Sequence, residues 1–456
     1  MAWADANYQH KKEITIDHTL VEGDETDFPV LIKITDGDLT GCLANGHDIK
    51  FYESTETIQL KHERVEWNNA TGYLIAYVKI PSLSSTVDTT IYMYYEYNAE
   101  GGDQADPTNV WDSDFIIVLH CNDADTQLTD STSNGYDFPE VLNPDYRETG
   151  KIGYACYADN AWRQNNGDCW ELNDNSFKTD FHNLSESTIE WWTACDQTAT
   201  GTTGMLMSIK HDGGDDVRMV YEPDNPNGTG FLCDYDDGPV DYRVDDRVHT
   251  WAANEWHYGA AAQNNTDTDM EVYVDGDSVG VDNLVGTFSY NTADGLFTIA
   301  SRHLAAYAAA YDGKLEEIRF SGIDREDNWI KTSYNTENDP SSFMSFGAEQ
   351  NQSTAWTKDL SETLSLSESI EKEVELNKSD SLSLSESFGR QVDFERGLTE
   401  SLSLSESIYQ RLGRFFRFPL KHKIYKRYKY KLKNTEKGKY RKKDGKKYKY
   451  RVKKQE

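Results

Sequence analysis

The sequence predicts an all-β protein: two consecutive β-sandwiches, then a repetitive Ser/Leu-rich stalk and a basic β-rich tail. Three observations lead to this fold class. Runs of Val, Ile, Thr and Tyr alternate with polar residues, clusters of Gly, Asn and Asp separate the runs, and aromatic residues are plentiful, with 28 Tyr, 17 Phe and 11 Trp. Alternation with a period of two, interrupted by turn residues at short intervals, is typical of sandwiches and barrels.

Changes in composition along the 456 residues divide the chain into four predicted parts. They are a β-sandwich domain (1–107), a second β-rich domain (113–349), a stalk or linker with LSLSES repeats (350–410) and a basic Tyr/Lys tail (411–456).

The first part contains strand-like segments such as YLIAYVKI (73–80), in which alternate residues from Leu74 to Ile80 share one face. Its phrases FPVLIKI (28–34), GHDIKFYES (46–54) and IYMYYEYN (91–98) resemble a family of unknown function that often precedes a laminin-G-like module. The resemblance implies a β-sandwich and no particular chemistry.

The second part carries five phrases in an order that resembles the laminin-G-like jelly roll, a concanavalin A-like sandwich. They are IIVLHCNDADTQLTDSTSNGYDF (116–138), GKIGYACYAD (150–159), STIEWWTA (187–194), EWHYGAAAQNNTDTDMEVYVDGDSVG (255–280) and DGKLEEIRFSGIDREDNWIKTSYNTENDPSSFMSFG (312–347). Two of the phrases also predict local structure directly. Asp275-Gly276 is a strong hairpin signal, and Trp329, Ile330 and Tyr334 are spaced as on a short helix.

The third part repeats LSLSES from Leu364, Leu382 and Leu402, with leucines on one face and serines on the other if extended. One such unit cannot bury its apolar face alone, so the repeats favour a fibrous stalk in a homo-oligomer, for example a trimer. A flexible serine-rich linker and a short helical bundle remain open as alternatives.

The tail gives the chain an uneven charge. Net charge is −33, but residues 411–456 hold 21 Lys/Arg and three acids, which leaves an acidic body of −51 and a tail of +18. Tyrosines alternate with cations around Asp444-Gly445, which predicts a small cationic hairpin, with disorder as the alternative. We expect this segment to dock on an acidic partner or sister chain rather than on nucleic acid, through Lys429, Lys431, Lys433, Lys447, Lys449 and Arg451.

The remaining composition bears on where the chain is made. It has no apolar run long enough to span a membrane and no secretory signal at its start, so we expect synthesis in the cytoplasm. The six cysteines have no zinc-ligand spacing, and we expect buried free thiols, with a Cys156–Cys169 disulfide as the alternative.

Catalysis is not expected. Retaining and inverting glycosidases need two carboxylates at set separations. Glucanases of the concanavalin type usually place them on one strand, whereas the matching phrase TIEWWTA has the single acid Glu190.

The resemblance implies binding instead, with sugars held by aromatic platforms and loop polar groups, frequently near a calcium ion. The candidate sugar-binding residues are Trp162, Trp170, Tyr221, Tyr235, Tyr242 and Trp251. Asp123 and Glu316 occupy the positions where the resemblance implies a structural Ca²⁺ between the opening and closing strands.

These features together predict a non-enzymatic surface-binding protein, a viral fibre or adhesin component that recognises host glycans. Its partners would be a host glycan or polysaccharide and, through residues 350–456, other virion proteins or sister chains; its location would be the virion surface. The alternatives are an extracellular or cell-surface carbohydrate-binding protein of a microbe and a glycoside hydrolase on a concanavalin-like fold.

Overall fold

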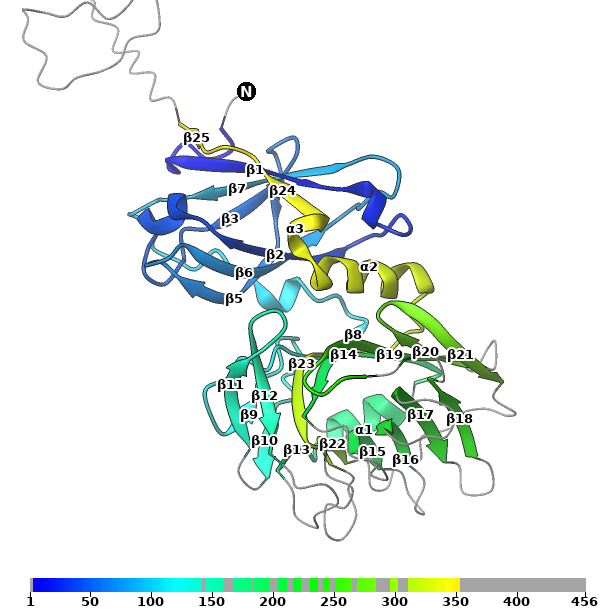
Figure 1. The fold of residues 1–456 in the computed structure, drawn as a ribbon. Helices are drawn as coiled ribbons and strands as arrows, with labels where there is room; N and C mark the ends of the chain where they lie inside the picture. The colour runs from blue at the N-terminus through cyan, green and yellow to red at the C-terminus, as the bar shows by residue number, and fades with distance from the viewer. Residues whose placement is uncertain are drawn as a thin grey trace, which may run out of the picture. The chain divides into compact units, whose positions relative to one another are not determined.

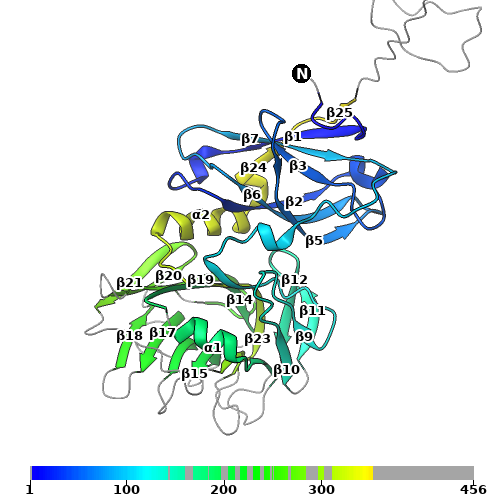
Figure 2. The same ribbon diagram turned by 180° about the vertical axis from the view of Figure 1, so that it is seen from behind.

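The computed structural model describes residues 3–141, 144–159, 168–182, 184–196, 204–210, 216–222, 230–236, 241–246, 249, 251–264, 269–283, 296–301 and 311–352. These residues form one compact unit within residues 1–357. It contains two β-sandwiches, as predicted, and Figures 1 and 2 show them from opposite sides. The predicted stalk and tail, including the six cationic docking residues, lie outside the described residues.

The first sandwich pairs a larger sheet with a three-stranded one. The larger sheet has the order β24-β1-β7-β3-β4, with β25 also on β1, and the smaller has the order β2-β6-β5. Their strands are β1 (His10–Ile16), β2 (Phe28–Thr35), β3 (Lys50–Glu53), β4 (Gln59–Leu60), β5 (His62–Asn68), β6 (Tyr73–Ile80), β7 (Thr89–Tyr95), β24 (Met344–Phe346) and β25 (Gln350–Asn351). Three 3-10 turns accompany them: η1 (His18–Leu20), η2 (Gly37–Gly41) and η3 (Pro107–Asn109).

In the part of the second sandwich that the structure describes, there are two sheets of eight strands. One has the order β18-β17-β16-β15-β22-β13-β10-β9, and the other the order β11-β12-β23-β14-β19-β20-β21 with β8 also on β23. The first sheet consists of β9 (Gln127–Leu128), β10 (Phe138–Val141), β13 (Cys169–Leu172), β15 (Gly204–Lys210), β16 (Asp216–Glu222), β17 (Gly230–Asp236), β18 (Asp241–Asp245) and β22 (Phe297–Ile299). The second consists of β8 (Phe115–Leu119), β11 (Asp145–Thr149), β12 (Tyr154–Ala158), β14 (Glu186–Cys195), β19 (Trp256–Asn264), β20 (Asp269–Val274), β21 (Asp277–Asn283) and β23 (Gly313–Ser321).

Among the described residues, three helices complete the fold: α1 (Asn175–His182), α2 (Asp327–Asn338) and α3 (Pro340–Phe343). The predicted helix at Trp329 and Ile330 is confirmed as α2. The Asp275-Gly276 hairpin is also confirmed, because both residues have positive φ between β20 and β21. No helix among the described residues is both long enough and apolar enough to cross a membrane.

The end of the unit returns to the first sandwich. Strand β24 pairs with β1, from Ile14 opposite Phe346 to Ile16 opposite Met344, and the side chains of Phe343 and Met344 are buried in the first core. The predicted domain boundary at residue 349 therefore needs correction, because α2, α3, β24 and β25 pack on or pair with the first sandwich. The second sandwich is inserted between two pieces of the first.

Strand β14 shows how the second sandwich packs against the first. Successive side chains of a strand point to opposite faces. Ile189 and Trp191 lie in the core of the second sandwich, whereas Trp192 lies in the core that also contains Tyr77 of β6. The outer face of this sheet is therefore covered by the first sandwich.

Candidate functional site

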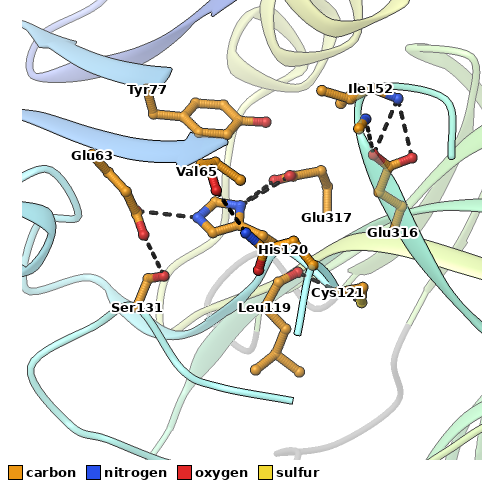
Figure 3. A network of polar contacts seen from close by, with 12 residues as sticks. Glu63, Val65, Tyr77, Leu119, His120, Cys121, Ser131, Ile152, Glu316 and Glu317 are labelled. Carbon is orange, nitrogen blue, oxygen red and sulfur yellow. Dashed lines mark hydrogen bonds and ion pairs between the residues drawn. The ribbon is translucent and has the colours of Figure 1, made fainter. Parts of the chain in front are cut away.

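A buried network of charged side chains joins the two sandwiches (Figure 3). His120, which follows β8, lies between two carboxylates: its Nδ1 is 2.9 Å from Glu317 of β23, and its Nε2 is 3.1 Å from Glu63 of β5. The imidazole also stacks on Tyr77, with ring centroids 5.3 Å apart. A histidine placed between two carboxylates is held in its charged form.

Arg319, two residues after Glu317 in β23, extends the network. Its Nη2 donates to Tyr77 Oη at 2.9 Å and to Glu317 Oε2 at 3.1 Å, and it also donates to Glu337 of α2. Trp192 Nε1 donates to the other oxygen of Glu337 at 2.7 Å. Strands of both sandwiches and α2 thus meet at one guanidinium.

The charges in this network shift one another's pKa values. Burial by itself lowers the pKa of His120, but Glu317 and then Glu63 outweigh it and raise that pKa to about 10. For Glu317, burial opposes ionisation, yet His120 and Arg319 hold its pKa below the ordinary value. Burial raises the pKa of Glu337. In this network each buried carboxylate has a cationic partner, and the pairs link strands of one sandwich to strands of the other.

The pKa of His120 predicts how stability depends on pH. The folded pKa of about 10 lies above the ordinary 6.5, so the stabilisation is complete below pH 6.5 and is lost as pH rises through 10. We expect wild type to exceed His120→Gln in free energy of unfolding by several kcal/mol near pH 6, on the order of 1.4 kcal/mol per pKa unit. Urea denaturation at intervals from pH 6 to 10.5 should show this difference shrinking; a constant difference would contradict the assignment.

A β-bulge on β23 places Glu316 and Glu317 on the same side of the sheet. Leu315 and Ile318 both lie in the core of the second sandwich, so one extra residue stands between them, and Glu317 has a φ of 52°. The pairing of β23 with β14 shifts register at this point. A bulge redirects side chains in this way. Here it lets Glu317 contact His120 while Glu316 contacts the backbone near Lys151.

Glu316 is enclosed by the backbone of residues 150–153. Its carboxyl oxygens accept N–H hydrogen bonds from Lys151 at 2.6 Å, from Ile152 at 3.1 Å and from Gly153 at 2.6 Å. A Cβ on Gly150 would lie 2.4 Å from Glu316 Oε2, which explains the glycine at the start of the GKIG phrase. Glu316 thus anchors this loop.

The same geometry bears on the expected calcium site. Burial and then the charge of Glu317 raise the pKa of Glu316 to about 8, although the three N–H donors lower it. The oxygens of Glu316 are occupied by the N–H groups of Lys151, Ile152 and Gly153, which take the place that a cation would need. Asp123 is instead engaged by the Thr129 N–H at 3.1 Å. The contacts of these two side chains do not support a shared cation.

A different trio has the spacing of metal ligands. Within the described ranges, Asp17, His18 and Asp88 have ligand atoms within 4.8 Å of one another. They lie at η1 and just before β7, on the first sandwich, and include neither Asp123 nor Glu316. His18 Nδ1 is 2.6 Å from Asp88 Oδ1, so a hydrogen bond accounts for their proximity.

Three of the six candidate sugar-binding aromatics belong to the core. Trp170, Tyr221 and Trp251 are 0%, 1% and 6% exposed and lie in the interior of the second sandwich. The expectation that they form open platforms is wrong, because a buried ring offers no face to a sugar. Neighbouring turn residues do not indicate exposure, because they flank aromatic residues in the core as well as at the surface.

The other three candidates stay predictions. Trp162 lies outside the described residues, and the side chains of Tyr235 and Tyr242 do as well, although their backbones pair directly across β17 and β18. Two open polar grooves occur in the described part of the chain. One of about 350 Å³ is lined by residues including Lys61 and Gln104, and one of about 370 Å³ by residues including Glu271 and Arg325.

Glu190, the acid of the TIEWWTA phrase, is sealed in the joint between the sandwiches. It is 1% exposed, its Oε1 accepts a 2.5 Å hydrogen bond from the Tyr258 hydroxyl, and the same oxygen is 3.9 Å from Arg319 Nη1. The sequence pattern did not reveal the charged network around His120 and Arg319. Glu63, His120 and Glu337 occupy ordinary strand, loop and helix positions with no local signature, so only their shared location reveals them.

Residues 166–331 match the concanavalin A-like lectin/glucanases superfamily, and residues 45–133 match a domain of unknown function, DUF2341. No curated protein matches the chain.

Solved structures show more distant likenesses. The binding domain of Botulinum neurotoxin DC, in complex with rat synaptotagmin II, is 12% identical with a TM-score of 0.37, over 49% of this chain and 51% of that chain. Domain 4 of AbnA, a GH43 extracellular arabinanase from Geobacillus stearothermophilus in complex with arabinotriose, is 16% identical with a TM-score of 0.36, over 48% of this chain and 98% of that chain. The chain thus spans about half the length of the neurotoxin domain it matches.

The order of the two family matches is the order predicted from the sequence phrases, and the strands of both matched segments belong to the two observed sandwiches. The chain therefore carries a laminin-G-like domain of the concanavalin A-like lectin/glucanases superfamily, preceded by a DUF2341 domain.

Proposed function

We propose that this protein is a non-enzymatic binding protein that recognises surface glycans. The superfamily description covers both lectins and glucanases. The burial of Glu190 favours the lectin type. A glycosidase carboxyl group must reach the scissile bond together with a second one. Glu190 lies under the first sandwich and is held by Tyr258 and Arg319, so no glycan can reach it.

Glycan binding is tested with the full chain on a glycan array. We expect binding to one class of glycans, and we expect Glu190→Gln to bind within about twofold of wild type, because this side chain lies away from any open surface. Release of reducing sugar from a panel of polysaccharides, abolished by Glu190→Gln, would contradict the proposal.

The same array, repeated in EDTA, tests the calcium expectation separately. Binding that disappears in EDTA and returns with Ca²⁺ would support a calcium ion near the ligand. Binding that is unchanged in EDTA would contradict the calcium expectation and leave glycan recognition intact.

We further propose that the protein is a fibre or adhesin component of a virion, made in the cytoplasm and assembled through residues 350–456 into a homo-oligomer. The repeats and the charge contrast between tail and body support this proposal. Capsid or tail genes beside the coding sequence are the expected genomic setting. Cell-envelope genes, or an upstream signal peptide in the same reading frame, would instead point to a microbial surface protein.

A further inference from the structure

Two of the six buried cysteines lie next to each other inside the second sandwich. Cys121 comes two residues after the end of β8, and Cys156 is in β12. Both side chains are 0% exposed and belong to the same core cluster. They are 35 positions apart in the sequence, so the fold, and not local spacing, brings them together.

Strand pairing explains their proximity. Along its whole length β23 has β14 on one edge, so β8 and β12 must share the other edge. Leu119 of β8 pairs with Ile318, and Cys156 of β12 pairs with Leu315. The chain leaving β8 therefore carries Cys121 to the place where β12 begins.

The register of β8 and β12 on β23 therefore places the two thiols in the same part of the core. Burial, and then a hydrogen bond with the Cys156 thiol, raise the pKa of Cys121 well above its ordinary value. Each sulfur also lies near a backbone carbonyl, Cys121 Sγ at 3.9 Å from Leu119 O and Cys156 Sγ at 3.4 Å from Leu315 O. All six cysteines are buried free thiols in the structure, as expected from the sequence, and the alternative Cys156–Cys169 disulfide is not formed.

We propose that Cys121 and Cys156 are a disulfide-forming site, which stays open as two free thiols when the chain folds in a reducing cytoplasm and closes when it folds in the presence of an oxidant. A glutathione disulfide is a sufficient oxidant. One cysteine thiolate attacks it and releases one glutathione thiol, and the second cysteine thiolate then attacks the mixed disulfide and releases the other. Two S–H bonds are lost and one S–S bond forms, while the two electrons reduce glutathione disulfide to two thiols.

Burial determines when the reaction takes place. A thiol with a raised pKa and no access to solvent reacts slowly, so the bond should form during folding, before the second sandwich closes. Once made, the bond ties the end of β8 to β12 beside β23. Such a crosslink stabilises chiefly by restricting the unfolded chain, more so for a longer loop. This inference is independent of glycan binding, so either can fail without the other.

The test is oxidative refolding of the full chain. Denatured, reduced protein is refolded in a mixture of reduced and oxidised glutathione, or in reductant alone, then denatured again so that every free thiol is alkylated, and digested without reduction. We expect a linked peptide containing Cys121 and Cys156 only in the glutathione sample, with the other four cysteines alkylated. We also expect a midpoint of thermal unfolding about 5 °C higher than in the reduced sample, reversed by dithiothreitol.

Matched variants complete the design. Cys121→Ala and Cys156→Ala should each abolish the linked peptide and the thermal shift, while Cys42→Ala, a change at a buried cysteine of the first sandwich, should keep both. The proposal would be overturned by wild type alone if Cys121 and Cys156 are found alkylated after refolding with glutathione. It would also be overturned if other cysteine pairs predominate.

Discussion

Replacing Arg319 by Met is expected to lower the free energy of unfolding by about 3–5 kcal/mol, because it leaves buried carboxylates without their cation. Arg319 is 3% exposed and contacts Glu317, Glu337 and, at 3.9 Å, Glu190. Methionine keeps much of the side-chain volume, so the loss measured by urea denaturation reports the charge and its hydrogen bonds.

The matched control is Lys61→Met, which removes the same charge from an exposed pair with Asp106. Exposed pairs contribute about 0–1 kcal/mol, so this variant should unfold near the wild-type midpoint. Adding Glu337→Gln to Arg319→Met should recover part of the loss, because one uncompensated charge is then removed. Equal losses for the Arg319 and Lys61 variants would show that the network contributes little.

Truncation after residue 339 is expected to unfold the first sandwich, although the cut is far in sequence from β1 to β7. The truncation removes α3, β24 and β25, and with them the buried side chains of Phe343 and Met344. Burial of each contributes about 1.5–3 kcal/mol, and the pairing of β24 and β25 with β1 is lost as well. The total approaches the stability of a typical domain.

The experiment compares chains 1–339 and 1–357 by circular dichroism and urea denaturation, since residues 1–357 form the compact unit. Phe343→Ala within 1–357 should cost about 3–5 kcal/mol, whereas Val87→Ala, at a side chain 67% exposed, should cost little. If 1–339 unfolds at the same urea concentration as 1–357, the returning strand is not an integral part of the first sandwich.

Several features could be predicted from the sequence because they depend on near neighbours. The alternation in YLIAYVKI became β6, Asp275-Gly276 became a hairpin turn, and Trp329 and Ile330 became part of α2. The ordered phrases also indicated a laminin-G-like domain, which the family match at residues 166–331 confirms. Backbone preferences and side-chain periodicity act over a few residues and can be read locally.

The site could not be predicted in the same way. An aromatic residue between turn signals has the same local appearance on the surface as in the core, so the burial of Trp170, Tyr221 and Trp251 was not visible. The GKIG phrase was recognised as a family feature, but its role became clear only when its N–H groups were found around Glu316.

The amino-acid sequence by itself determined the strands, their turns and the kind of domain they build. Only the tertiary structure decided which distant element covers each face or edge of a strand. Tyr77 of β6 contacts Arg319 of β23, and β24, which contains Met344, pairs with β1. The physical reason is that burial of a charge or an apolar side chain depends on groups that can be hundreds of positions away. The alternation of neighbouring residues contains no information about those groups.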